Sequence, residues 1–437
     1  MPCRLKAVSD GICILIRLES IIEQAQNINK LNNGRTLRCR TDKTEESPMS
    51  KKLHPQTLAI RGGKEQTEYR EHNQALFLTS SFMWDNAQHA ADLFSKKIKG
   101  FTYTRTANPT TAAFEKRIAA LEGAERAVAT STGMSAIQAA FFTFLQAGDH
   151  VVSSRSLFGT TVGFINNIVT KFGIEVSHVS PTDINEWKAA VKANTKLLFL
   201  ETPSNPLGEV ADLEALAELA HGIGAILVVD NSLLSPVGSQ PLKHGADISV
   251  SSATKAIDGH GRVMGGVLAG SEELMAQVAM YCNSCGLAMS PFNAWQLLSG
   301  VETLSLRMEK QFDNALKIAQ WLQAQPQVQA VYYTGLPDHP QAELIRKQQN
   351  GGGIVIGFEV ADQAAAWKVV DGVELFSRTA NLGDVRSTIT HPWTTTHGRM
   401  QPEEKLAANI RPGLVRLSVG LEYVGDLIDD LKQALAR

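Results

Sequence analysis

The sequence predicts an α/β protein in which a large, mostly parallel sheet domain is followed by a smaller α+β domain. From about residue 113, short runs rich in Val, Ile and Leu alternate with stretches of helical periodicity. Strands that are apolar on both faces and joined by helices form parallel sheets covered on both sides. After about residue 300 this alternation ends and a long amphipathic stretch begins. With 437 residues, 43% of them apolar, the chain can build two large cores.

The first part of the pattern contains the elements of the sheet. Strands are predicted at 150–155, 196–202, 225–232 and 247–255. Helices are expected between them, for example at 134–145 and at 211–224. The second of these has apolar residues at helical spacing and ends in glycine, which is a common helix stop.

The remaining segments do not show this alternation of apolar strands and helices. Beyond residue 300 we predict a long amphipathic helix at 302–325, strands at 352–360 and 414–422, and a closing helix at 424–436. The large domain is therefore expected over 113–300 and the α+β domain over 301–437. Residues 49–112 show few strong periods, and we expect them to form an arm that contacts a neighbouring subunit.

The first 48 residues differ from the rest of the chain. A short, interrupted apolar patch is followed by a polar stretch, and Met49 then opens a segment typical of a protein start. We expect a weakly ordered N-terminal extension over 1–48. A targeting role is the alternative, although the mixture of acids and bases is not that of a transit peptide.

The cysteines give little sign of metal or redox use. Cys3, Cys13 and Cys39 lie in the expected extension, which leaves Cys282 and Cys285 as a single CxxC pair. One pair supplies two ligands, whereas a structural zinc site needs four. We therefore expect core packing here, no metal, and a reducing, cytoplasmic location.

The overall charge excludes broad classes of partner. The net charge is −2, so no global basic field exists to hold nucleic acid. No run of eighteen apolar residues occurs that could cross a membrane. Small molecules are the expected partners.

Two charged residues occur where strands of the predicted sheet end. Asp230 ends an apolar strand, and Lys255 follows another. Ligands of parallel-sheet proteins bind outside the carboxyl ends of the strands, so both charges fall where a ligand would lie. Pyridoxal 5'-phosphate would use both, because its ring nitrogen pairs with an acid and its aldehyde reacts with an amine. The alternative is that Asp230 caps a turn and Lys255 is solvated.

A phosphate site is indicated near residue 133. Gly133 and Met134 begin a predicted helix, whose first N–H groups and dipole favour an anion. Ser252 and Thr254, predicted two residues apart on one strand face, could add hydroxyl donors. No GxGxxG or Walker fingerprint offers a nucleotide site instead.

Together these motifs resemble a known family. In order along the chain, YTRTANPTT, STGMSA, ETPSNPLGE, VVDNS, SSATK and LVRLSVGLE resemble the Cys/Met-metabolism family of pyridoxal-phosphate-dependent enzymes. The likeness covers residues 50–437. It implies the fold-type I architecture, with a large sheet of the seven-stranded type and a smaller C-terminal domain, and a homotetramer made of dimers that share active sites.

The resemblance also implies roles for single residues. Lys255 matches the Schiff-base lysine and Asp230 the partner of the ring nitrogen. The phosphate ligands that it implies are Gly133, Met134, Ser252 and Thr254, with Tyr103 and Arg105 reaching in from a neighbouring subunit. Asn205 matches the residue that hydrogen-bonds the cofactor's 3' oxygen. Arg416 matches the clamp for the substrate α-carboxylate, a task suited to a bidentate guanidinium.

Three positions distinguish branches of the family. Phe158 stands where several relatives have a tyrosine that stacks on the cofactor, so the stacking area remains but the hydroxyl is lost. Arg262 stands where many lyases have an acid, and we expect it to meet a distal substrate carboxylate. Asn381 is expected among the substrate-binding residues. His391 and His397 lie in a Pro/Thr loop and are expected to be hydrogen-bonding residues.

These features resemble the sulfhydrylase branch. The implied reaction is a γ-replacement in which O-succinyl-L-homoserine and sulfide give L-homocysteine and succinate. Because Phe158 has no hydroxyl, Lys255 would carry more of the proton transfers. Use of cysteine or of an acetyl ester, and degradation of methionine or homocysteine, stay open as alternatives.

Overall fold

A computed structural model describes residues 53–64 and 66–437, which belong to one compact unit. The extension expected over 1–48, with Cys3, Cys13, Cys39 and the proposed start at Met49, lies outside the described residues.

The larger sheet has seven strands in the order β1-β7-β6-β5-β4-β2-β3. The strands are β1 (Arg126–Thr130), β2 (His150–Ser154), β3 (Glu175–Val179), β4 (Thr195–Glu201), β5 (Ile226–Asp230), β6 (Ile248–Ser251) and β7 (Gly266–Gly270). β7 runs antiparallel to β1 and β6, and all other neighbouring strands of this sheet pair in parallel. The predicted α/β class with a mostly parallel sheet is therefore confirmed.

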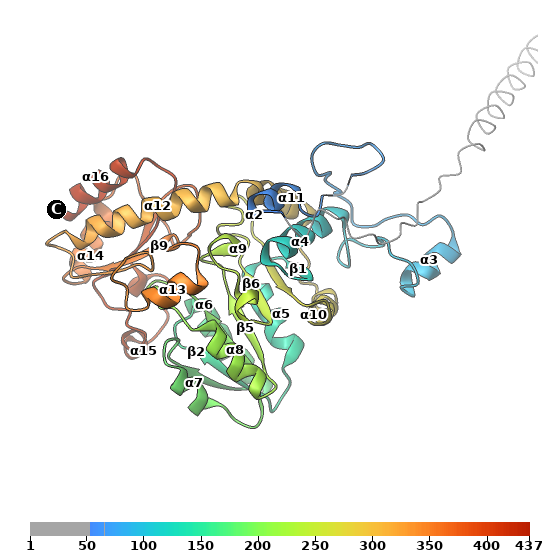
Figure 1. Ribbon diagram of the computed structural model, residues 1–437, viewed down its shortest axis with the longest axis horizontal. Coiled ribbons are helices and arrows are strands. Elements are labelled where there is room, and N and C mark those ends of the chain that lie inside the picture. Colours follow the sequence, from blue (N-terminus) through green and yellow to red (C-terminus); the bar gives the residue numbers. More distant parts are fainter. Residues whose placement is uncertain (1–52, 65) are drawn as a thin grey trace, which may run out of the picture. The chain divides into compact units, whose positions relative to one another are not determined.

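Alternate residues of the central strands bury opposite faces of this sheet. Leu197 and Val228 pack into one core, and Leu198 and Leu227 into another. The first core is completed by α5 (Gly133–Phe144), α6 (Gly159–Asn167) and α10 (Glu272–Cys285), and the second by α7 (Ile184–Ala190) and α8 (Leu213–Gly222). Figure 1 shows helices on both faces, as runs of Val, Ile and Leu require.

A third apolar core covers the β1–β7 end of the sheet. It joins Ala127 and Val267 to α4 (Pro109–Glu122) and α11 (Pro291–Glu302), with α2 (Pro55–Arg61) beside them. In the predicted arm, α3 (Ala87–Phe94) has no buried residue. The short helix α9 (Ser235–Gly238) follows β5.

A second sheet lies in the C-terminal part of the chain. Its order is β10-β11-β12-β9-β8, from β8 (Ala330–Tyr332), β9 (Val355–Glu359), β10 (Ser377–Arg378), β11 (Thr388–Thr390) and β12 (Leu414–Ser418). Its helices are α12 (Leu304–Gln323), α13 (Ala342–Gln348), α14 (Gln363–Gly372), α15 (Pro402–Ala407) and α16 (Val424–Leu435). In Figure 1 these orange and red elements lie around one sheet, and β9, β12, α12, α14 and α16 share an apolar core.

The helix expected over 302–325 is confirmed as α12, which begins at Leu304 and ends at Gln323. One detail of the predicted elements is wrong. Ser252 and Thr254 do not lie on a strand face, since β6 ends at Ser251 and the chain then turns, with Lys255 N–H donating to Ser252 O at 3.1 Å.

The cysteine pair is divided between core and surface. Cys282 is 4% exposed and packs in the core, as expected, but Cys285 is exposed at the end of α10. The expectation of core packing therefore holds for one of the two.

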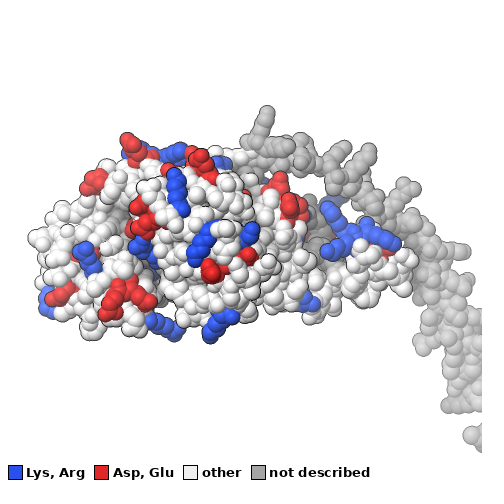
Figure 2. Space-filling view, turned by 90° about the horizontal axis from the view of Figure 1, so that it is seen from below, with Lys and Arg blue, Asp and Glu red and all other residues white. Residues whose placement is uncertain are grey.

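The described surface carries both signs of charge. On the face in Figure 2, Lys and Arg are interspersed with Asp and Glu over most of the surface. Within residues 53–64 and 66–437, no helix is long and apolar enough to cross a membrane.

Candidate functional site

The turn that carries Lys255 follows β6 and is held from two sides. Gly259 N–H closes it by donating to Lys255 O at 2.8 Å. From α12, the buried Arg307 donates to Ala256 O and Gly300 O, each at 2.7 Å. The turn therefore has a fixed path, although most of its residues belong to no helix or strand.

The amine of Lys255 lies in an environment that favours its neutral form. Burial, with a smaller contribution from the nearby Arg416 cation, lowers the pKa of Lys255 from 10.5 to about 8. Lys255 Nζ donates to Asn381 Oδ1 at 3.0 Å. A lysine whose pKa is lowered in this way is suited to nucleophilic attack on a carbonyl carbon.

Two acids end adjacent strands beside this turn. Asp230 ends β5 and pairs in register with Glu201, the last residue of β4. Both are buried, and burial raises the pKa of each, with repulsion by Asp230 adding to the rise at Glu201. Ser232 donates twice to Asp230 Oδ1, from N–H at 3.0 Å and from Oγ at 2.6 Å.

Glu201 is a candidate that the sequence analysis missed. Its Oε2 accepts a hydrogen bond of 2.8 Å from Phe158 N–H, at the start of α6. It therefore links the position of Phe158 to the acid pair. The signal that could have found it is the one used for Asp230, a carboxylate at the end of an apolar strand.

Arg416 is a buried cation with spare hydrogen-bonding capacity. It lies on β12 and is 1% exposed. Its Nη2 donates to Ala380 O at 2.8 Å and its Nη1 to Asn205 Oδ1 at 3.5 Å, while its Nε has no partner among the described residues. Burial lowers the pKa of Arg416 to about 10. Glu201 opposes this shift by its charge, but the Nε that has no partner among the described residues leaves the guanidinium able to bind a carboxylate ligand.

Gly133 lies close to Ser252, as expected if both contact the same phosphate group. It begins α5, where the Thr132 side chain caps Ser135 N–H, so the cap does not occupy the N–H groups of Gly133 and Met134. A Cβ at Gly133 would lie 2.7 Å from Ser252 Cβ. The structure thus brings Ser252 to the helix start. Thr254 instead hydrogen-bonds Gly265, through its Oγ1 to Gly265 O at 3.2 Å.

The predicted phosphate ligands of the arm, Tyr103 and Arg105, are exposed in this chain. Tyr103 is 46% exposed, and the guanidinium of Arg105 lies 5.6 Å from its ring centre. Arg105 Nη1 donates to Asn283 O on α10. Phe158 is 36% exposed, which leaves part of its ring available for contact.

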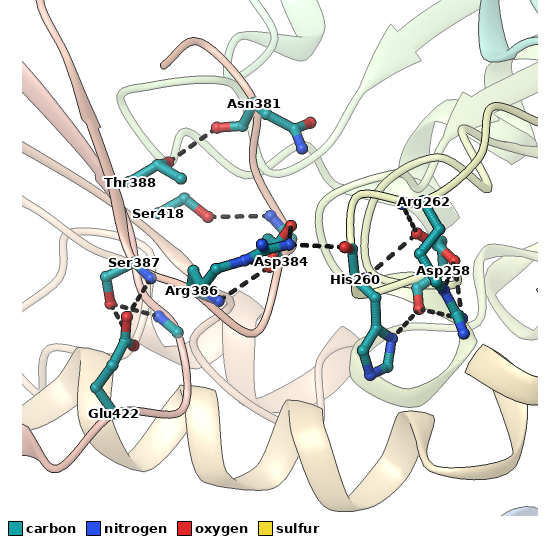
Figure 3. A network of polar contacts seen from close by, with 12 residues as sticks. Asp258, His260, Arg262, Asn381, Asp384, Arg386, Ser387, Thr388, Ser418 and Glu422 are labelled. Atoms are coloured by element: carbon teal, nitrogen blue, oxygen red, sulfur yellow. Dashed lines mark hydrogen bonds and ion pairs between the residues drawn. The ribbon is translucent and has the colours of Figure 1, made fainter. Parts of the chain in front are cut away.

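Arg262 is already paired inside the protein. Its Nε and Nη2 lie 3.0 and 2.9 Å from Asp258 Oδ1, and Nη2 also lies 3.2 Å from Gln296 O. Figure 3 shows Arg262 turned towards Asp258, while Asn381 belongs to a separate part of the view. The expectation that Arg262 meets a substrate carboxylate therefore gains no support from its contacts.

The two loop histidines hydrogen-bond as expected. His391 Nε2 lies 2.7 Å from Pro412 O, and His397 Nδ1 lies 3.0 Å from Thr396 Oγ1. Burial, with Arg416 nearby, lowers the pKa of His397 to about 4, so this ring is neutral near pH 7.

The residues present fit pyridoxal phosphate. Gly133 allows the Ser252 side chain to approach the start of α5, and this helix start supplies N–H donors. Asp230 is a buried acid that a cationic ring nitrogen would compensate, and Lys255 supplies an amine of lowered pKa.

Comparisons with known proteins agree with this chemistry. A model of the Cys/Met metabolism PLP-dependent enzymes matches residues 56–436. An O-succinylhomoserine sulfhydrylase of Pseudomonas aeruginosa is 50% identical over 381 residues, 87% of this chain and 94% of that protein. An L-methionine gamma-lyase of Fusobacterium nucleatum subsp. polymorphum is 41% identical over 392 residues, 89% of this chain and 99% of the relative.

Solved structures extend the likeness to the fold. A cystathionine gamma synthase from Xanthomonas oryzae pv. oryzae superposes with a TM-score of 0.84 at 36% identity, covering 88% of this chain and 98% of that one. A putative O-acetylhomoserine (thiol)-lyase from Campylobacter jejuni, which carries a pyridoxyl-lysine monophosphate, gives 0.85 at 30% identity, covering 88% and 100%. This chain belongs to the Cys/Met metabolism family of PLP-dependent enzymes.

Proposed function

We propose that the protein converts O-succinyl-L-homoserine and sulfide to L-homocysteine and succinate by γ-replacement. The observation that carries this proposal is the 50% identity with an O-succinylhomoserine sulfhydrylase over 94% of that protein. Lys255 Nζ donates to Asn381 Oδ1, and Arg416 Nη2 donates to Asn381 O at 3.3 Å, so the two side chains lie beside the same residue. This arrangement supports the proposal, because the reaction needs an amine and a carboxylate site side by side.

The proposed cofactor site uses the strand ends and the start of α5. Lys255 would hold pyridoxal phosphate covalently, and Asp230 would keep its ring nitrogen protonated. The remaining cofactor contacts that we propose come from Gly133, Met134, Ser252, Thr254 and Asn205, from the stacking ring of Phe158, and from Tyr103 and Arg105 of a second subunit. When bound, the cofactor supplies an electron sink for carbon-acid chemistry at the substrate.

The chain's own residues would then bind the substrate and move protons. Arg416 would bind the α-carboxylate through a guanidinium that keeps an unpaired Nε. Lys255 would take the proton from Cα, because its lowered pKa leaves a useful fraction of neutral amine near pH 8. Asn381, which accepts from Lys255 Nζ, would orient the amine for this transfer.

Arg262 has the weakest claim among the proposed substrate contacts. Its guanidinium would have to leave Asp258 to reach a succinyl carboxylate. Unchanged preference for succinyl over acetyl esters in Arg262→Ala would remove it from the site.

A substrate panel tests the proposed reaction. Purified protein would receive O-succinylhomoserine with sulfide or with cysteine, O-acetylhomoserine with sulfide, or methionine alone. Homocysteine from the succinyl ester and sulfide is the expected main product. Release of methanethiol and 2-oxobutanoate from methionine would instead favour a γ-lyase, the activity for which the relative with 41% identity is named.

The cofactor anchor is tested separately from the substrate. Borohydride reduction of the yellow holoprotein, followed by digestion, should place the reduced adduct on Lys255, and Lys255→Ala should be colourless. An adduct on another lysine would overturn the proposed site whatever the panel shows.

We also propose a homotetramer built from dimers that share active sites. The predicted arm exposes large apolar side chains, with Leu78 70%, Met83 98% and Phe94 68% exposed. We infer that these side chains are covered by a second subunit, because exposed apolar side chains that gather on one segment are typical of an interface. Light scattering should show a tetramer, and Leu78→Asn with Phe94→Ser should reduce the assembly. Leu375→Asn, at a 52% exposed position outside the arm, is the matched control.

A further inference from the structure

Residues 381–387, which we name the strap, pass directly over the turn of Lys255. Gly383 makes the closest approach, since a Cβ there would lie 2.5 Å from Ala256 N and 2.9 Å from Lys255 C. Its φ of +79° also favours glycine. The strap begins with Asn381, the residue that accepts from Lys255 Nζ. Its path therefore decides where that acceptor lies.

A hydrogen bond from Arg386 joins the strap to the far end of the same turn. Arg386 Nε and Nη2 donate to Asp384 at 2.8 and 2.9 Å, and Nη2 also donates to His260 O at 2.7 Å. Beside them, Val385 N–H donates to Gly259 O at 2.8 Å. Figure 3 shows Arg386 reaching from Asp384 to the His260 carbonyl.

The other side of the strap rests on β12 and α12. Gln311, which is fully buried, donates to Asp384 O and Val419 O, each at 2.9 Å. Gly383 N–H donates to Ser418 Oγ at 3.0 Å. Ser387 N–H donates to Glu422 Oε1 at 2.7 Å. The strap is thus fixed to the smaller sheet, and Arg386, which Asp384 holds in place, links it to the lysine turn through His260 O.

The Arg386 link acts on Lys255 through the position of the strap and not through its charge. Arg386 is 62% exposed, so its charge is well screened, whereas Asp384 is 8% exposed. Charged groups facing the pair are Glu422 and the buried Arg307. The cation that acts on Lys255 is Arg416 of β12. Arg386 therefore influences the amine mainly through the position of Asn381.

We propose that Asp384 and Arg386 are positioning residues, which hold the strap on the lysine turn so that Asn381 Oδ1 stays within hydrogen-bond distance of Lys255 Nζ. The inference rests on the proposed function only in treating Lys255 as the reactive amine. A carboxamide oxygen stabilises an ammonium group, so loss of this contact favours the neutral amine and lowers the pKa of Lys255 below about 8.

The test measures the Lys255 amine in the full chain freed of cofactor. Labelling by pyridoxal 5'-phosphate and borohydride is followed across pH, and the midpoint is read from the Lys255 peptide alone. Arg386→Gln and Asn381→Ala should each lower the midpoint by about half a unit to one unit, a roughly three- to fivefold rise in the neutral fraction and hence in labelling rate at pH 7. The double variant should match Asn381→Ala, because both changes act through one contact.

Matched variants separate positioning from general damage. Arg386→Lys, which keeps the charge but not the two-sided contact, should fall between wild type and Arg386→Gln. Arg437→Gln removes an exposed arginine pair with Glu374, at 3.4 Å, and should leave the midpoint unchanged. If Arg386→Gln does not fold, Asp384→Asn replaces it and should shift the midpoint in the same direction.

Two outcomes would overturn the proposal. One is an unchanged midpoint in folded Arg386→Gln, and the other is a double variant whose shift is the sum of the two single shifts. Failure of the wild-type protein to label at Lys255 would instead remove the proposed cofactor site, so the two failures are distinguishable.

Discussion

Substitution of Gly133 by alanine should weaken cofactor binding without unfolding the protein. The added Cβ would lie 2.7 Å from Ser252 Cβ and 3.1 Å from Ser252 Cα. Ordinary contacts are about 3.5–4.0 Å, so the start of α5 or the turn at Ser252 must move by roughly 1 Å. A shift of that size misaligns N–H donors to a phosphate, and a lost charged hydrogen bond costs about 1.5–3 kcal/mol. The dissociation constant of pyridoxal phosphate should therefore rise about 10- to 150-fold.

The assay is titration of cofactor-free protein with pyridoxal phosphate, followed by the visible absorbance of the bound form. Thermal unfolding of the cofactor-free protein shows whether the variant is folded. Gly163→Ala is the matched control, because a Cβ there meets nothing within 4 Å and Gly163 lies inside α6. It should bind normally and gain up to about 1 kcal/mol of stability from helix propensity. Equal affinity in Gly133→Ala and wild type would refute the reasoning.

Two further substitutions test the electrostatics. Arg416→Gln should raise the pKa of Lys255 above about 8 by at most about one unit, because burial, the larger cause of the lowering, remains; an unchanged labelling midpoint would contradict this. Asp430, on α16, accepts from the N–H groups of residues 374–376 at 2.8, 2.9 and 3.2 Å. Asp430→Ala should reduce the free energy of unfolding by about 2–4 kcal/mol in denaturant titrations. Burial alone would raise the pKa of Asp430, but these donors outweigh it and lower the pKa below 3.8. The stabilisation is therefore present above pH 3.8 and is lost as the pH falls through the pKa of the folded state. Similar stability of Asp430→Ala and wild type at pH 6 would contradict this prediction.

Local sequence signals predicted the strands that carry the candidate site. Runs of Val, Ile and Leu place β4, β5 and β6 because both faces of these strands are buried, and that argument also put Asp230 at a strand end. The missed strands have weaker signals. β1 and β7 are rich in Ala and Gly, and β3 lies at the edge of the sheet with partly exposed residues.

Long-range contacts could not be predicted in the same way. Asn381 meets Lys255 across 126 positions, and only the docking of the strap on the lysine turn brings them together. Arg262 shows the opposite case, since its sequence position suggested a ligand contact but Asp258, four residues earlier, takes its guanidinium. The charge of a side chain and its place in the sequence do not show whether it pairs with another residue of the protein or stays available to a ligand.

The buried charges also predict how substrate binding should affect the amine. Arg416 lowers the pKa of Lys255 by repulsion, and its own Nε has no partner among the described residues. A carboxylate bound to Arg416 would offset that repulsion, so the pKa of Lys255 should rise and the amine should become a stronger base when the site is filled. In cofactor-free protein, acetate should therefore raise the Lys255 labelling midpoint, while chloride at equal ionic strength should not. Arg416→Gln should abolish the difference between the two salts. A midpoint that acetate leaves unmoved in wild type would show that Arg416 is not the carboxylate site, because an anion held there must change the field at the amine.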